Sequence, residues 1–290
     1  MGRIIKYFMP YILLLPVLLL IVFIFIAGII FGALQSLGYF PAIGLKTFTL
    51  KYYKYIFKDP NFFSSLKFSL YTSFVSSFLA VVVGVLLAYF LLANSKKDLG
   101  FYNVYKIPII VPHTVAALLV FVLFSQSGWI ARILYRLGFI HNMTEFYPLV
   151  FDSKGIGVIL AYIWKGAPFI TLITYDILKK INDSYSKVAL NLGANSFQVF
   201  WYVLLPLALP TILSGFIIIF AFSFGAFEIP YLLGPSNPKA LPVLAYIYYK
   251  SIDLFERPYG MVINMCITFY SLIMVVLYVL VFQLIKKYKI

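Results

Sequence analysis

Two ionisable residues lie within long apolar stretches of this sequence, where their side chains could bind a polar solute. Lys165 follows Trp164 in the stretch YIWKGAPF, and Glu228 lies in the stretch FGAFEIPYLLG. A charge at the centre of a bilayer costs roughly 3 kcal/mol, so such a side chain usually faces a bundle interior or a water-filled cavity. Glycine and proline lie beside both residues, and irregular backbone at this depth is tolerated where it lines a cavity. We therefore predict that Lys165, Glu228 and Trp164 line a pathway for solute.

A structural ion pair is the alternative role for Lys165 and Glu228. With a helical rise of about 1.5 Å per residue, Glu228 lies roughly 8 Å and Lys165 roughly 15 Å below the outer face of the membrane. A lysine side chain is long enough to cover part of this difference, so the sequence allows the two charges to pair. Nearby, Pro108 and Pro112 bend the start of an apolar segment and free backbone carbonyls. We predict that His113, which follows them, is a hydrogen-bonded packing residue rather than a proton relay.

The segments that must position these side chains are apolar enough to be membrane spans. Of the 290 residues, 63% are hydrophobic and 11% are charged, whereas a soluble domain carries about 25% charged residues. Several apolar runs exceed the roughly 20 residues that a helix needs to cross a bilayer, and backbone groups in hydrocarbon must be satisfied within their own segment. We predict an all-α membrane protein, one domain over residues 1–290, with six spans at about 10–34, 62–93, 102–125, 156–178, 207–233 and 260–285.

The basic residues indicate how the spans are oriented. The net charge is +14, and because the lysines and arginines lie in the loops and at the two ends, they would meet the headgroups of the lipid bilayer rather than nucleic acid. With the N-terminus inside, the inner loops, which include Lys96 and Lys97, carry about as many basic residues as the outer loops but are shorter. Their charge is therefore denser. We predict a multi-pass protein of the cell (plasma or inner) membrane with both termini in the cytoplasm.

The loop between the fourth and fifth predicted spans, residues about 183–206, has a pattern of its own. Asp183 or Ser184 can cap a first short helix, and Gly193 stands where a helix C-terminus needs a residue that tolerates positive φ. Ser196 can cap a second helix. In this second helix, apolar side chains recur at i, i+3, i+4 and i+7 and form one face, which comprises Phe197, Phe200, Trp201 and Leu204.

An aromatic stripe of this kind would be a liability in water, so another surface should cover it. One candidate cover is the lipid headgroups or the protein's own spans. The other is a partner subunit. The predicted orientation places the loop in the cytoplasm, so such a partner would be cytoplasmic.

Loop 183–206 resembles the EAA loop of ABC importer permeases, whose pattern is E-A-A, three residues, G, nine residues and I-x-L-P. The corresponding residues are Lys187-Val188-Ala189, Gly193 and Val203-x-Leu205-Pro206, and Ala194 and Phe200 also suit the family pattern. A weaker resemblance extends over most of the chain, including Lys106–Val120 and Gly128–Ile140. The family's glutamate is replaced by Lys187, which reverses the charge, so a contact at this position would rest on packing or on an acidic residue of the partner.

The resemblance implies a type I importer permease, with six transmembrane helices and a cytoplasmic coupling helix between the fourth and the fifth. In such importers two permease chains form the pathway, and a heterodimer is expected rather than a homodimer. An ABC ATPase dimer carrying ATP and Mg²⁺ binds the cytoplasmic loops, and an extracytoplasmic solute-binding protein delivers the solute. The coupling residues that the resemblance implies are Lys187, Val188, Ala189, Gly193, Ala194, Phe197, Phe200, Trp201, Leu205 and Pro206.

Motifs for catalysis are absent from the sequence. It contains no G-x-x-x-x-G-K-[ST] phosphate-binding loop and no G-x-S-x-G nucleophile motif. Its single cysteine, Cys266, lies in an apolar run, and no Cys/His cluster has the spacing of a metal site. We predict a transport subunit that is not an enzyme and binds no cofactor or metal, with ATP hydrolysis on a separate ATPase chain.

The segment Gly225–Tyr246 looks like the permeases grouped with polyamine, iron and related small-ion importers. This resemblance implies spermidine or putrescine as the first candidate solute, followed by ferric iron, a phosphonate, thiamine or a sugar. An ion-coupled secondary transporter is the alternative from another class. It would be expected to show internal repeats with paired broken helices, and no convincing repeat is evident in this sequence.

Overall fold

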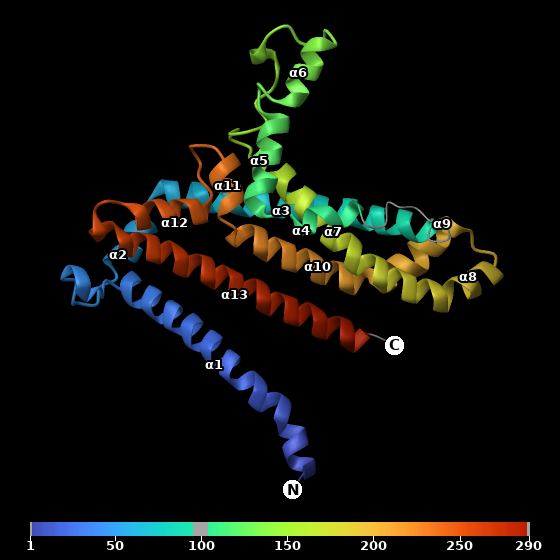
Figure 1. Cartoon of the computed structure of the whole chain (residues 1–290), viewed down its shortest axis with the longest axis horizontal. Helices are drawn as coiled ribbons and strands as arrows, with labels where there is room; N and C mark the ends of the chain where they lie inside the picture. The colour runs from blue at the N-terminus through green and yellow to red at the C-terminus, as the bar shows by residue number, and fades with distance from the viewer. Residues whose placement is uncertain (1, 95–103, 289–290) are drawn as a thin grey trace. The chain divides into compact units, whose positions relative to one another are not determined.

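The computed structural model describes residues 2–94 and 104–288, which are mostly helical (Figure 1). Within these residues no β-strand is present, and six helices are long and apolar enough to cross a membrane. These findings confirm the predicted all-α class and the number of spans. Lys96, Lys97 and the first two residues of the predicted third span lie outside the described residues.

The chain divides into two compact units, one formed by residues 1–59 and 244–266 and the other by residues 60–243 and 267–290. The first unit holds α1 (Gly2–Ser36), α2 (Lys51–Ile56), most of α12 (Leu241–Lys250) and the first turns of α13 (Arg257–Tyr288). The second unit holds the rest of α13 together with α3 (Pro60–Ala93), α4 (Ile107–Ile110), α5 (His113–Phe124), α6 (Trp129–Arg136), α7 (Ile156–Ile181), α8 (Lys187–Asn191), α9 (Ser196–Val199), α10 (Leu205–Gly225) and α11 (Glu228–Leu233).

The first unit packs around aromatic side chains. Tyr52 of α2 is buried, and its ring meets that of Tyr259 edge-on, with 5.0 Å between the ring centroids. At the end of α1, the hydroxyls of Ser36 and Tyr53 are hydrogen-bonded at 2.9 Å. By contrast, the most apolar 18-residue window of α1 contains no buried residue. That helix therefore presents an apolar surface suited to lipid or to another membrane chain.

Helices α3, α7 and α10 pack against one another at the centre of the second unit (Figure 1). Small residues allow α3 and α7 to approach closely, because a Cβ on Gly84 would lie only 2.7 Å from the side chain of Ile170. Across the same contact, the Thr171 hydroxyl is 3.2 Å from the Gly84 carbonyl oxygen to which it donates. Membrane helices associate through this kind of close packing and hydrogen bonding, so the contact fixes how α3 and α7 sit against each other.

The predicted third span, residues 102–125, is interrupted in the structure. Helix α4 ends at Ile110, and Val111 is extended, with ψ of 130°, before α5 begins at His113. The cause is Pro112, because a proline disfavours the helical conformation in the residue before it. This break leaves carbonyls of α4 without helical partners.

The predicted fifth span, residues 207–233, is also two helices rather than one. Helix α10 ends at Gly225, Ala226 is extended with ψ of 137°, and α11 begins at Glu228. In a continuous helix, Pro230 would have no N–H for the carbonyl of Ala226, and its ring would clash with that carbonyl. The break therefore places Glu228 at the start of a new helix.

Candidate functional site

Loop 183–206 begins as a continuation of α7. Residues Asn182–Ser186 stay helical with wider i→i+5 turns, and α8 follows directly. The buried Ser186 hydroxyl donates to Oδ1 of Asn182 at 2.6 Å. The predicted cap at Asp183 or Ser184 is therefore wrong, because a cap requires a non-helical residue at the start of a helix and the chain is already helical there.

The turn between α8 and α9 depends on Gly193. Its φ is +90°, as predicted, and its N–H donates to the carbonyl of Leu190 at 3.0 Å. The next N–H, that of Ala194, donates to the carbonyl of Ala189 at 3.1 Å. A Cβ on Gly193 would meet nothing within 4 Å. Glycine is thus favoured by the left-handed backbone conformation and not by a shortage of space.

Asn195, and not Ser196, caps the second short helix, so the prediction for Ser196 is wrong. The Asn195 side chain accepts from the N–H of Gln198 at 2.9 Å, and the Gln198 side chain accepts from the N–H of Asn195 at 2.8 Å. This reciprocal pair is a capping box. The sequence did carry the signal, because a glutamine stands three residues after Asn195, whereas Val199, three residues after Ser196, cannot reciprocate.

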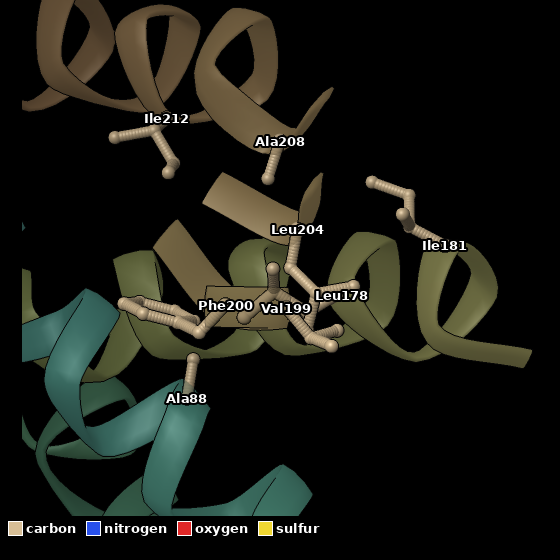
Figure 2. Close-up of a cluster of buried hydrophobic side chains, with 8 residues drawn as sticks. All are labelled: Ala88, Leu178, Ile181, Val199, Phe200, Leu204, Ala208 and Ile212. Atoms are coloured by element: carbon tan, nitrogen blue, oxygen red, sulfur yellow. The ribbon is translucent and has the colours of Figure 1, made fainter. Parts of the chain in front are cut away.

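The aromatic stripe divides into an inner and an outer half. Phe200 and Leu204 are buried in an apolar cluster between the loop and the spans (Figure 2). The Phe200 ring is 4.2 Å, centroid to centroid, from that of Tyr89 on α3. The other buried members of the cluster are Ala88, Leu178, Ile181, Val199, Ala208 and Ile212. The protein's own spans therefore cover this half of the stripe.

The outer half of the stripe stays exposed. Phe197 is 66% exposed and Trp201 is 48% exposed, and their ring centroids are 6.0 Å apart. The i→i+5 turns of residues 200–204 replace the 3.6-residue period on which the single face was predicted. Exposed and buried side chains thus alternate along the stripe, with Phe200 and Leu204 buried and Phe197 and Trp201 exposed.

The remaining predicted coupling residues differ in how far they are buried. Ala189, Ala194 and Leu205 pack partly against the buried cluster. Lys187, Val188, Gly193 and Pro206 are exposed. Four further exposed hydrophobic residues of the loop were not among the predicted coupling residues: Tyr185, Leu190, Leu192 and Tyr202.

Lys165, the first candidate pathway residue, binds the broken end of a helix. Its Nζ donates to the carbonyl oxygens of Pro108 at 2.7 Å and Val111 at 2.6 Å, with a longer contact of 3.4 Å to that of Ile109. These carbonyls belong to α4 and to the break after it. The ammonium group thus satisfies acceptors that the interruption at Pro112 left free.

Glu228, the second candidate, has a different partner from Lys165. Its Oε2 lies 3.9 Å from Nδ1 of His113, and its side chain is 57% exposed. The alternative of a Lys165–Glu228 ion pair is therefore not what the structure contains. His113, predicted as a packing residue, is partly buried and faces both the Glu228 carboxylate and the ring of Phe222, whose centroid is 5.1 Å away.

A cavity of about 250 Å³ lies between α3, α7, α10 and the break before α5. Its polar lining consists of Ser76, Ser77, His113, Tyr162, Lys165 and Ser223. The Tyr162 hydroxyl donates to the Ser223 carbonyl at 3.1 Å. Of the predicted pathway residues, only Lys165 belongs to this lining, since Trp164 is half-buried outside it and Glu228 lies beyond His113.

Residues 80–289 match the sequence profile of a protein family described as "Binding-protein-dependent transport system inner membrane component". That match covers most of the chain and includes the loop and all the residues that line the cavity except Ser76 and Ser77. The chain belongs to this family. It is an ABC importer permease subunit and a multi-pass membrane protein, which confirms the resemblance noted in loop 183–206.

The permease is similar to several characterised or named proteins. It is 24% identical over 220 residues to the probable sulfate transport system permease protein cysT of Prototheca wickerhamii, an alignment that covers 76% of this chain and 82% of that one. It is 26% identical over 208 residues to the molybdate/tungstate transport system permease protein WtpB of Pyrococcus abyssi, covering 71% and 74% of the two chains.

The fold of the permease also matches a solved structure. A chain in the crystal structure of a bacterial alginate ABC transporter, in complex with an alginate pentasaccharide-bound periplasmic protein, superimposes with a TM-score of 0.75. The match covers 96% of this chain and 95% of the other at 19% sequence identity. At that identity the likeness concerns the fold, which agrees with the predicted type I permease class.

Proposed function

We propose that this permease is the transmembrane subunit of an ATP-driven, binding-protein-dependent importer, and that loop 183–206 binds its ATPase. In this proposal the loop and both termini lie in the cytoplasm of a cell whose plasma or inner membrane holds the protein. ATP and Mg²⁺ are bound by the ATPase dimer, and this chain contributes no catalytic residue.

The observation that carries the proposal is the division of the aromatic stripe. Phe200 is held in the apolar cluster with α3 and α7, while Phe197 and Trp201 remain exposed on the same short stretch. A partner that covers the exposed rings would be linked to the spans through the buried ones. Because packed elements move as rigid bodies, closure of the ATPase dimer would be transmitted into movement of the spans.

The charge of the loop bears on what kind of contact the ATPase makes. Lys187 is exposed where the family pattern has glutamate, so a basic residue on the ATPase would be repelled there. We infer that this position meets either an acidic residue of the ATPase or no charge at all. The main affinity would then come from the exposed aromatic side chains, which dominate the binding energy of many interfaces.

Two further partners follow from the proposal. A second permease chain completes the pathway, and the exposed apolar length of α1 offers a surface for it or for lipid. We propose a heterodimer for this pair. A solute-binding protein on the outer side delivers the solute, as the matched alginate transporter was crystallised with a periplasmic protein.

The solute is a small polar compound. The sequence resemblance supports spermidine or putrescine first, then ferric iron, a phosphonate, thiamine or a sugar. The names of the relatives add sulfate and molybdate or tungstate to these candidates. A polyamine would need carboxylates around it, and the Glu228 carboxylate is outside the lining of the intramembrane cavity, so the polyamine candidate rests on the sequence resemblance of Gly225–Tyr246.

A substitution at Leu192 tests the docking role. Leu192 is 84% exposed, so Leu192→Asp removes no packing within this chain but places a charge in the proposed interface. We expect affinity-tagged Leu192→Asp protein to lose the subunit that carries the G-x-x-x-x-G-K-[ST] motif, identified by mass spectrometry, and to lose ATP hydrolysis. Burying an unpaired charge at an interface costs several kcal/mol, which is sufficient to remove the ATPase during purification.

Ile252 provides the matched control. It is fully exposed in the segment between α12 and α13, which the predicted orientation places on the outer side. The variant Ile252→Asp introduces the same charge and should retain the ATPase. If Leu192→Asp protein kept the ATPase and its activity at the wild-type level, the docking role of the loop would be refuted.

A further inference from the structure

The polar lining of the intramembrane cavity contains one ammonium group and no carboxylate, and the hydroxyls of Ser76 and Tyr162 already donate to backbone carbonyls. Its polar side chains are three serine hydroxyls, one tyrosine hydroxyl, the His113 imidazole and the Lys165 ammonium. A buried cation would need acceptors of negative charge around it, whereas a buried anion needs a positive charge and donors. The composition of the lining therefore favours an anion.

Ser77 is the lining residue whose own hydrogen bonding is incomplete. It is 1% exposed, and its hydroxyl oxygen has no hydrogen-bond partner among the described residues. A buried polar group without a partner costs about 1–3 kcal/mol, so a native structure that keeps one needs a reason for it. A ligand in the cavity would supply the missing partner.

Lys165 makes a cation an unsuitable occupant. The carbonyl oxygens of Pro108 and Val111 form an acceptor site at the end of α4, and the Lys165 ammonium already occupies it. The third contact of Nζ, to Ile109, is long at 3.4 Å. The carbonyls hold Lys165 in place without neutralising its charge, and one N–H remains weakly bonded and available to an acceptor.

The size and the walls of the cavity limit what it can hold. A volume of about 250 Å³ lies below the range of roughly 300–1,000 Å³ typical of sites for drug-sized ligands. The apolar part of the lining includes Ile109, Phe169, Ile219 and Phe222. Such walls lower the local dielectric constant and strengthen the attraction between Lys165 and an anion. A small ion fits these conditions, and an oligosaccharide does not.

We propose that this cavity is a binding station for a small tetrahedral oxyanion of the sulfate type on its way through the permease. Lys165 supplies the positive charge, and the hydroxyl of Ser77 donates to an anion oxygen, whereas the Ser76 hydroxyl already donates to the Ser73 carbonyl at 3.2 Å. Glu228, which pairs with His113 outside the lining, is not a ligand. The inference rests on the proposed function, because it assumes that solute passes through this chain.

Two serines on α3 allow a matched test. Ser77 and Ser73 are one helical turn apart, and both are buried with a hydroxyl that lacks a partner among the described residues. Only Ser77 lines the cavity. We measure binding of radiolabelled sulfate by equilibrium dialysis to the purified full-length chain in detergent, without the ATPase or the binding protein. Molybdate and spermidine serve as competitors, and thermal unfolding is recorded for each variant.

We expect the wild-type chain to bind sulfate, with molybdate and not spermidine competing. Ser77→Ala should weaken sulfate binding about tenfold, the usual effect of one lost hydrogen bond to a charged group. Ser73→Ala should bind as the wild type does, and both variants should unfold at or above the wild-type temperature, because each loses a buried unpaired hydroxyl.

Several outcomes would overturn the inference: no sulfate binding by the wild-type chain, displacement of sulfate by spermidine, or an equal effect of Ser77→Ala and Ser73→Ala. These outcomes are separable from failure of the proposed function. The dialysis requires no ATPase, whereas the docking role is read from the ATPase retained on Leu192→Asp protein. A chain that loses one property and keeps the other identifies which of the two proposals is wrong.

Discussion

Phe197 and Phe200 lie three residues apart on the same stretch of loop 183–206, yet the structure gives them different surroundings. Phe200 is 5% exposed, and its ring contacts that of Tyr89 within the apolar cluster. Phe197 is 66% exposed and contacts the ring of Trp201. Replacing each with alanine therefore removes the same atoms from two different environments.

Phe200→Ala should have the larger effect on stability, and Phe197→Ala should have the larger effect on docking of the ATPase. Phe200→Ala leaves a cavity among buried side chains, which costs about 3–5 kcal/mol of unfolding free energy. Phe197→Ala removes an exposed ring, so the unfolding free energy should change by no more than about 0.5 kcal/mol. If Phe197 is a main contact with the ATPase, its loss should weaken docking by about 2 kcal/mol, or roughly 30-fold.

Two measurements on purified protein separate these effects. Denaturant unfolding of the chain in detergent reports stability, and titration with the purified ATPase subunit reports docking affinity. We expect Phe200→Ala to lose stability and Phe197→Ala to lose affinity while remaining as stable as the wild type. The division of the stripe would be refuted if Phe197→Ala proved the less stable variant, or if it bound the ATPase normally.

Two other substitutions probe the loop and the intramembrane charges. Gly193→Ala should cost about 1 kcal/mol of unfolding free energy in the same denaturant assay, because alanine disfavours a φ of +90°. A Cβ there would meet no neighbour, so no steric clash adds to this cost. An unchanged or higher stability would mean that the turn adopts another conformation. Glu228→Gln should abolish solute uptake while the complex stays assembled, because it removes the charge 3.9 Å from Nδ1 of His113; unchanged uptake would remove Glu228 from the pathway.

The sequence was sufficient to predict the spans because length and apolarity are local properties. The number of predicted segments agrees with the six candidate membrane spans among the described residues, although the third candidate covers residues 113–136 and overlaps the predicted segment 102–125 only in part. The interruption before His113 follows from Pro112, a residue at which the sequence predicts a bend. The interruption after Gly225 follows from Pro230. The glycine and proline beside Glu228 indicate irregular backbone there, but the segment was predicted as one span because the surrounding residues are continuously apolar.

The site was less predictable because it depends on distant contacts and on helix geometry. Lys165 bonds to carbonyls 54–57 residues away in the sequence, and no local pattern indicates that pairing. The split of the aromatic stripe depends on packing of Phe200 and Leu204 against α3 and α7, which no pattern within the loop indicates. Gly193, whose requirement is local, was predicted correctly, and the Asn195–Gln198 capping box could have been found by the same means.

Solute uptake by proteoliposomes is the most direct measurement of the central claim, that this chain imports solute only when an ATPase drives it. The vesicles would contain this permease, its partner permease and the ATPase, with the solute-binding protein added outside and ATP with Mg²⁺ enclosed. We expect uptake that requires ATP and ceases when the lysine of the ATPase's G-x-x-x-x-G-K-[ST] motif is replaced. Uptake by this chain alone, driven by a gradient of H⁺ or Na⁺ with no nucleotide present, would contradict the claim and establish a secondary transporter instead.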